Sequence, residues 1–106
     1  MRLRSAASFA MLALALSFST YTFADGGGDI FKTRCAACHG ATGAGDTTMG
    51  KNLKLADLGS PDAQKLTDDE LTAIITAGKG KMPAYGTKLS KEQISDLVKF
   101  IRTLKK

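Results

Sequence analysis

The five residues Cys35-Ala36-Ala37-Cys38-His39 form the stretch that decides how the rest of the chain folds. On a helical turn, Cys35 and Cys38 lie on one face, three positions apart. Two thiols placed in this way can each form a thioether with one vinyl group of a haem. His39, the next residue, can place an imidazole nitrogen on the iron. The spacing is typical of c-type haem attachment, and it predicts one covalent haem c per chain, held by Cys35 and Cys38 and ligated by His39.

Three other uses of the cysteine pair have to be weighed: a zinc half-site, a redox-active dithiol and a structural disulfide. Zinc would need two further ligands, and only carboxylates could supply them, because the chain has no other Cys or His. A redox dithiol usually belongs to a βαβ context, and no strand pattern surrounds this pair. Haem attachment is therefore the favoured interpretation, with a non-haem redox or disulfide protein as an alternative.

The start of the chain has the organisation of a secretory signal peptide. Two arginines supply positive charge, residues 6–18 form an apolar run too short for a comfortable membrane span, and the small residue Ala24 suits cleavage. An uncleaved N-terminal anchor is the alternative. We therefore expect a signal peptide over residues 1–24, a domain over residues 25–106, and export to a bacterial periplasm with no membrane span after cleavage.

The composition after the signal peptide favours a domain that needs a cofactor. Loss of two arginines leaves 13 of the 15 Lys and Arg against all 10 Asp and Glu, a net charge of +3, which does not argue for nucleic-acid binding. The remaining aromatic residues are Phe31, Tyr85 and Phe100, and there is no Trp. So small a chain with so few aromatics builds a marginal core by itself. A buried apolar group such as haem would supply the missing core.

Helical patterns dominate the domain and predict an all-α fold. A short helix is expected over residues 29–38, after a flexible glycine-rich lead-in at residues 25–28. Residues 40–50 contain four glycines and predict a loop whose backbone can approach a flat ligand closely. The pattern over residues 51–58 does not separate helix from strand.

Three later helices are predicted from the residues at which they begin. Ser60 as N-cap and Pro61 at the first helical position start a short helix. The segments Thr67–Glu70 and Ser90–Gln93 are capping boxes. The first precedes a helix that closes at Gly78. The second precedes the C-terminal helix, whose apolar stripe is Ile94, Leu97, Val98, Ile101 and Leu104.

A haem with one histidine ligand needs a second axial ligand or keeps an open position. The chain has no second histidine, and the methionines after the signal peptide are Met49 and Met82. Met82 lies between two predicted helices, and Pro83 restricts the backbone around it. Met49 lies among glycines and threonines, where nothing obvious would fix it. Met82 is therefore the predicted distal ligand, with an open iron as the alternative.

These features together resemble a class I cytochrome c, of the small bacterial single-haem kind. The resemblance rests on the haem motif near the N-terminus, the Met82-Pro83 loop and the apolar C-terminal helix, and it covers essentially all of residues 25–106. It implies about four short helices wrapped round one covalent haem whose edge reaches solvent. It also implies that Phe31 of the first helix packs near Phe100 of the last.

One departure from the family pattern concerns His39. Such proteins often carry Gly-Pro-Asn-Leu after the haem motif, and the carbonyl at the proline position accepts the N–H of the proximal histidine. Here the sequence is Gly50-Lys51-Asn52-Leu53. The Lys51 carbonyl can still accept, but no proline stiffens it, so the orientation of His39 is less firmly set.

The predicted ligand pair points to electron transfer. With His39 and Met82 both on iron, no position is open to substrate or O₂, which argues against an enzyme. The soft thioether favours reduced iron and raises the potential. We expect a soluble, monomeric one-electron carrier; the alternative is a haem-based sensor or catalyst with a labile sixth ligand. Basic residues near Met82 could steer a redox protein with an acidic docking surface, and they are Lys79, Lys81 and Lys88.

Overall fold

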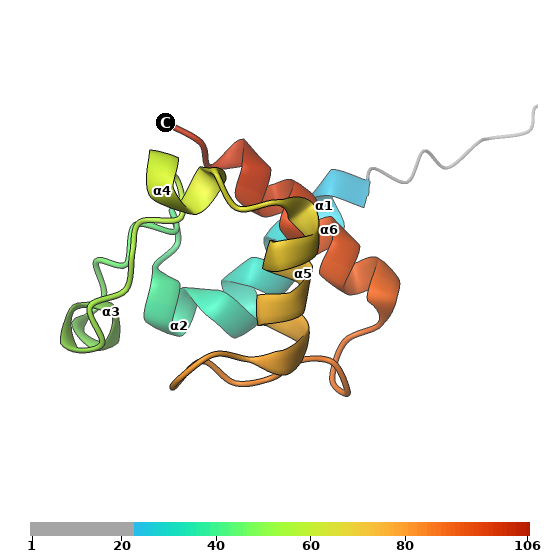
Figure 1. Cartoon of the computed structure of the whole chain (residues 1–106), viewed down its shortest axis with the longest axis horizontal. Coiled ribbons are helices and arrows are strands. Elements are labelled where there is room, and N and C mark those ends of the chain that lie inside the picture. The colour runs from blue at the N-terminus through green and yellow to red at the C-terminus, as the bar shows by residue number, and fades with distance from the viewer. Residues whose placement is uncertain (1–22) are drawn as a thin grey trace, which may run out of the picture.

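The computed structural model describes residues 23–106, and the described residues fold into helices joined by loops (Figure 1). The only β-type pairing among them is one isolated bridge between Lys79 and Met82. No helix of this part of the chain is long and apolar enough to cross a membrane. The elements are α1 (Phe23–Ile30), the π-helical stretch η1 (Phe31–Cys35), α2 (Ala36–His39), α3 (Thr48–Asn52), α4 (Pro61–Gln64), α5 (Asp68–Ala77) and α6 (Lys91–Thr103).

The expected all-α fold is therefore confirmed. The predicted signal peptide lies outside the described residues except for its last two positions, which belong to α1. The boundary between residues 24 and 25 stays a prediction.

The first helix begins earlier than the sequence predicts. Helical backbone runs from Phe23 through α1, η1 and α2 to His39, so the expected flexible lead-in at residues 25–28 is wrong. The reason is tertiary contact: α1 lies so close to α6 that a Cβ on Gly27 would collide with the carbonyl oxygen of Asp96. Glycine is a poor helix former, but here its missing side chain lets the two helices approach and pack.

The core lies where the N-terminal helices meet α5 and α6. The rings of Phe31 and Phe100 stand 5.1 Å apart between centroids, which confirms the packing implied by the family resemblance. Phe31 is 2% exposed, whereas Phe100 is half-buried. The buried cluster consists of Phe31, Leu71, Ile75, Leu89, Ile94, Leu97, Val98 and Ile101.

The predicted helix starts are confirmed. In α5, the Thr67 hydroxyl accepts from the Glu70 N–H at 3.0 Å, while the Glu70 carboxylate accepts from the Thr67 N–H at 3.1 Å. Ser90 and Gln93 make the same reciprocal pair at the start of α6. Ser60 caps α4. These local bonds satisfy N–H groups that a helix leaves unpaired at its start.

The sequence did not predict helix α3. Its residues span the end of the expected loop (residues 40–50) and the start of the segment (residues 51–58) whose pattern did not separate helix from strand. Thr47 is its N-cap: the hydroxyl accepts from the Gly50 N–H at 2.8 Å and donates to the Cys38 carbonyl at 2.6 Å. One side chain therefore starts α3 and fixes it against α2. After α3 the chain is irregular until α4.

Candidate functional site

A cavity of about 620 Å³ opens between α2, the segment after α3 and the loop after α5. Its volume lies in the range of ordinary ligand pockets. All four residues predicted to hold or ligate haem line it, and they come from two segments: Cys35, Cys38 and His39 from the helical motif, and Met82 from the loop. Apolar side chains of Leu53 and Leu55 contribute to the wall, as do Asn52, Pro83, Tyr85, Arg34, Lys79, Gly80 and Lys81.

The two cysteines are half-buried and are not joined in a disulfide. Burial raises the pKa of the Cys35 thiol to about 11, so it is protonated at neutral pH. A redox-active dithiol needs the opposite, a lowered pKa that yields a thiolate. A zinc site also lacks support, because no group of three or more His, Cys, Asp or Glu gathers anywhere in residues 23–106. The raised pKa of Cys35 thus disfavours the redox-dithiol alternative.

The imidazole of His39 has the properties of a metal ligand. Burial lowers its pKa, which keeps the ring neutral and able to donate a lone pair. Nδ1 of His39 is buried and has no hydrogen-bond partner, a rare condition that calls for an explanation such as a bound group. The Lys51 carbonyl, which the sequence left as a possible acceptor for His39, accepts instead from the Lys54 N–H at 3.2 Å.

Met82 is carried by a tight turn that folds back onto the end of α5. Its N–H donates to the Lys79 carbonyl at 2.9 Å, and its carbonyl accepts from the Lys79 N–H at 3.2 Å. Gly78 makes this possible: its φ is +76°, and a Cβ there would lie 2.6 Å from the Met82 oxygen. Met82 is half-buried against the core cluster. Met49, in α3, is 49% exposed and does not line the cavity.

Tyr85 is a cavity residue to which the sequence analysis gave no role. Its hydroxyl donates to the Arg34 carbonyl at 3.1 Å, across 51 positions of sequence. Burial raises the pKa of Tyr85, so the hydroxyl remains a donor at neutral pH. The available clue was a tyrosine in a loop three residues after a predicted ligand, in a chain with few aromatics, since a tyrosine hydroxyl beside a pocket commonly finds a hydrogen-bond partner.

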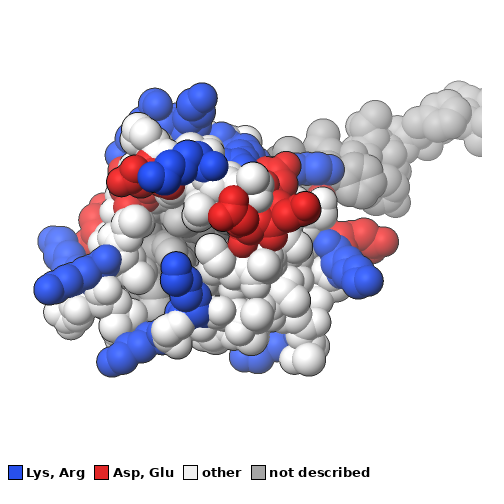
Figure 2. Space-filling model, in the orientation of Figure 1, with Lys and Arg blue, Asp and Glu red and all other residues white. Residues whose placement is uncertain are grey.

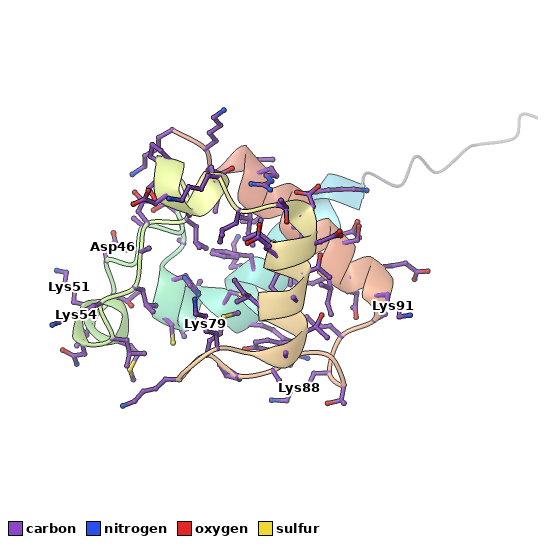
Figure 3. All side chains as sticks on the ribbon, viewed as in Figure 1. Asp46, Lys51, Lys54, Lys79, Lys88 and Lys91 are labelled. Carbon is purple, nitrogen blue, oxygen red and sulfur yellow. The ribbon has the colours of Figure 1, made fainter. Side chains whose placement is uncertain are left out.

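Basic side chains surround the mouth of the cavity. Figure 2 shows a hollow on this face with Lys and Arg around it, whereas acidic side chains gather over the start of α5, where Asp68, Asp69 and Glu70 lie. Arg34, Lys79 and Lys81 line the cavity, and Lys51 and Lys54 extend from α3 and the residues after it (Figure 3). We call the three basic residues that line the cavity, Arg34, Lys79 and Lys81, the basic rim.

Comparison with known proteins identifies the family. Residues 23–101 match the family model described as cytochrome C oxidase, cbb3-type, subunit III. The chain belongs to this family of c-type cytochromes. The individual relatives named below are cytochromes c6 and a further c-type cytochrome, so the small class I single-haem type predicted from the sequence is confirmed.

The cytochrome is similar to cytochrome c6 of Leptolyngbya boryana, 39% identical over 75 residues that cover 71% of this chain and 85% of that protein. Cytochrome c6 of a Picosynechococcus species is 33% identical over 104 residues, covering 91% of this chain and 88% of the relative. Among solved structures, the KustC0563 c-type cytochrome matches with a TM-score of 0.70 and 28% identity, over 76% of this chain and 98% of that one.

This cytochrome therefore carries one covalently bound haem c and serves electron transport. The residues present fit the group: the cavity has suitable volume and apolar walls, two unpaired thiols face the same space, and the buried nitrogen of His39 lacks a partner. The sequence prediction of covalent haem c is confirmed.

Proposed function

We propose that Cys35 and Cys38 attach the haem, that His39 and Met82 are its axial ligands, and that the protein is a one-electron carrier rather than an enzyme. The observation that carries the proposal is the meeting of these four residues in one cavity, although Met82 lies far from the others in sequence. Met49, the other methionine of the described chain, is outside that cavity.

The four proposed site residues would hold the haem in different ways. Cys35 and Cys38 would hold the haem covalently, each by addition of its S–H across one vinyl double bond, with sulfur on one carbon and hydrogen on the other, which needs no oxidant. Neutral His39 offers a nitrogen lone pair, and Met82 offers a soft sulfur that favours reduced iron and raises the potential. When bound, haem supplies a one-electron redox centre. If His39 and Met82 both hold the iron, no position would be left for a substrate, which favours a carrier over a catalyst or sensor.

The proposed cellular place is the bacterial periplasm, reached through a signal peptide at residues 1–24. The support is the organisation of that segment in the sequence. The domain of residues 25–106 would then be released without a membrane span. Within residues 23–106 no helix is suited to cross a membrane.

The proposed partner is a redox protein with an acidic docking surface. The ion pairs in the described part of the chain bind Lys65, Arg102 and Lys106 to carboxylates, and none involves the basic rim. Lys88 lies near it, with its ammonium 5.5 Å from the centre of the Tyr85 ring. Unpaired basic charges around the cavity mouth would attract an acidic surface and speed encounter.

The ligand assignment is tested by comparing Met82→Ala with Met49→Ala in the ferric protein. Met82→Ala should remove the sulfur-to-iron charge-transfer band, lower the potential, and tighten imidazole binding by about a hundredfold, as when a site open in about 1% of molecules becomes open in all. Met49→Ala should leave spectrum and affinity unchanged. If Met49→Ala opens the iron instead, the assignment is wrong. A high-spin spectrum of the unaltered protein would favour the labile-ligand alternative.

A further inference from the structure

One hydrogen bond joins the two walls of the cavity. The Tyr85 hydroxyl, on the loop that carries Met82, donates to the Arg34 carbonyl, directly before Cys35 in η1. In the described part of the chain, no other hydrogen bond links residues 78–89 to the motif helix. The acceptor lies in a π-helical stretch, an irregularity that often marks functional sites.

Hydrogen bonds connect the Tyr85 backbone to α5 and to the residues that follow it in the loop. Its N–H donates to the Ile75 carbonyl of α5 at 2.9 Å, and its carbonyl accepts from the N–H groups of Lys88 and Leu89 at 3.0 and 2.9 Å. The side chain packs against the buried core and lines the cavity with Met82. The hydroxyl is therefore carried by the loop where it leaves α5, and its bond to Arg34 links this wall of the cavity to the motif helix.

The Met82 turn has few restraints of its own. Most of its residues are exposed, and Gly78 and Gly80 both have positive φ. The paired bonds between Lys79 and Met82 lie within the turn and would move with it. Contacts that reach outside the turn must therefore determine how readily it leaves the cavity, and Tyr85 makes one of them three residues away.

We propose that Tyr85 is a positioning residue for Met82: the bond from its hydroxyl to the Arg34 carbonyl holds the loop closed and keeps the methionine sulfur at the iron. The inference rests on the proposed ligand role of Met82. It assigns to Tyr85 no contact with iron. Loss of the hydroxyl should leave the ligand set intact and make displacement of Met82 easier.

The test is Tyr85→Phe, which keeps the ring and its packing and removes only the hydroxyl. Imidazole is titrated into the ferric holoprotein, because it binds only when Met82 has left. In the variant, displacement of Met82 no longer has to break the Tyr85–Arg34 bond, so imidazole should bind roughly two- to fivefold more tightly. This is the lower part of the range for one hydrogen bond, because water can replace the bond at this exposed site. The charge-transfer band should persist without imidazole.

Thr33→Val is the matched control. The Thr33 hydroxyl also bonds backbone carbonyls, but those of Asp29 and Ile30, one turn earlier on the same helix. It makes no link to the Met82 loop, so its removal should leave imidazole affinity unchanged. Unchanged affinity in Tyr85→Phe, or an equal change in both variants, overturns the inference.

Failure of the inference can be told apart from failure of the ligand assignment. If Met82→Ala removes the charge-transfer band while Tyr85→Phe binds imidazole like the unaltered protein, Met82 remains the ligand and only the role of Tyr85 is wrong. If Met82→Ala keeps the band, both are wrong. If Tyr85→Phe lowers the denaturation midpoint but leaves imidazole affinity unchanged, the Tyr85–Arg34 bond stabilises the fold without positioning Met82. That result also overturns the inference.

Discussion

The helix pair α1 and α6 and the cavity side of the molecule are built differently. Where the pair packs, glycine backbone meets backbone, Phe31 meets Phe100, and the stripe of α6 is almost fully buried. On the cavity side, the helices are four or five residues long, and the walls include exposed loop residues and unpaired basic charges. Around the pair, apolar side chains are buried against one another, whereas on the other side Leu53 and Leu55 line the cavity that the haem would fill.

Side-chain bonds to backbone tie α4 and the segment before it to α6. Gln64 donates to the carbonyls of Leu58 and Ile101 at 2.7 and 2.9 Å. Arg102, on α6, donates to the Gln64 carbonyl at 2.9 Å and pairs with Asp68. These bonds tie the loop segments to the helix pair, but each contributes only about 1 kcal/mol. The difference predicts that changes to the cofactor and changes to the pair will have separable effects.

The largest expected effect is that of replacing both cysteines. Cys35→Ala with Cys38→Ala should abolish covalent haem, so that acid-acetone extraction removes all pigment, whereas the unaltered protein keeps its haem. Because the haem would bury its apolar surface only in the folded state, the thermal transition of the double variant, which lacks the haem, should also fall. Complete extraction of haem from the unaltered protein would contradict the assignment of the thioethers.

The comparison is sharpened by a change confined to the helix pair. Phe100→Ala should lower the free energy of unfolding by about 2–3 kcal/mol, somewhat below the cost for a fully buried aromatic because Phe100 is half-buried. The holo spectrum should survive. Met49→Ala removes an exposed side chain and should change stability by less than about 0.5 kcal/mol. A loss below about 1 kcal/mol for Phe100→Ala would contradict its place in the core.

The smallest expected effect is on docking at the basic rim. Lys79→Glu with Lys81→Glu should reduce the second-order rate of electron transfer with an anionic partner several-fold at low salt and leave the spectrum unchanged, because charge steers encounter rather than the redox centre. The rate for the unaltered protein should fall as salt rises.

A matched control separates docking from net charge. Lys99→Glu with Lys105→Glu makes the same change in charge at exposed positions that do not line the cavity. This variant should lose much less of the rate. If both double variants lost the same fraction of the rate, or if the rate did not depend on salt, the docking proposal would be wrong and the basic rim would be an ordinary solvated surface.

Much of the fold was predictable because it depends on neighbours in sequence. The capping boxes at Thr67 and Ser90 and the stripe of α6 predicted their helices, since caps form between residues three apart and the stripe follows the helical repeat. Three of the four predicted site residues lie together for a similar reason: Cys35, Cys38 and His39 follow one another within a single short helical stretch.

Other features depended on partners that the sequence does not reveal. Glycine content predicted a flexible lead-in, but contact with Asp96 makes that segment part of α1. Thr47 starts α3 while bonding the Cys38 carbonyl, and the Lys51 carbonyl pairs with Lys54 instead of His39. In each case a long-range contact or a competing local donor changed what propensity alone predicted.

The sequence by itself determined the chemistry of the site: two thiols and an imidazole at fixed spacing, and a methionine next to a proline. Those residue types act through covalent and ligand bonds whose geometry is set within a few positions. Only the tertiary structure decided that Met82 rather than Met49 faces the cavity, that Tyr85 reaches Arg34, and that Arg34 lines the same cavity as Lys79 and Lys81. These relations depend on how distant segments pack. Burial and close contact determine that packing, and the local sequence pattern does not encode it.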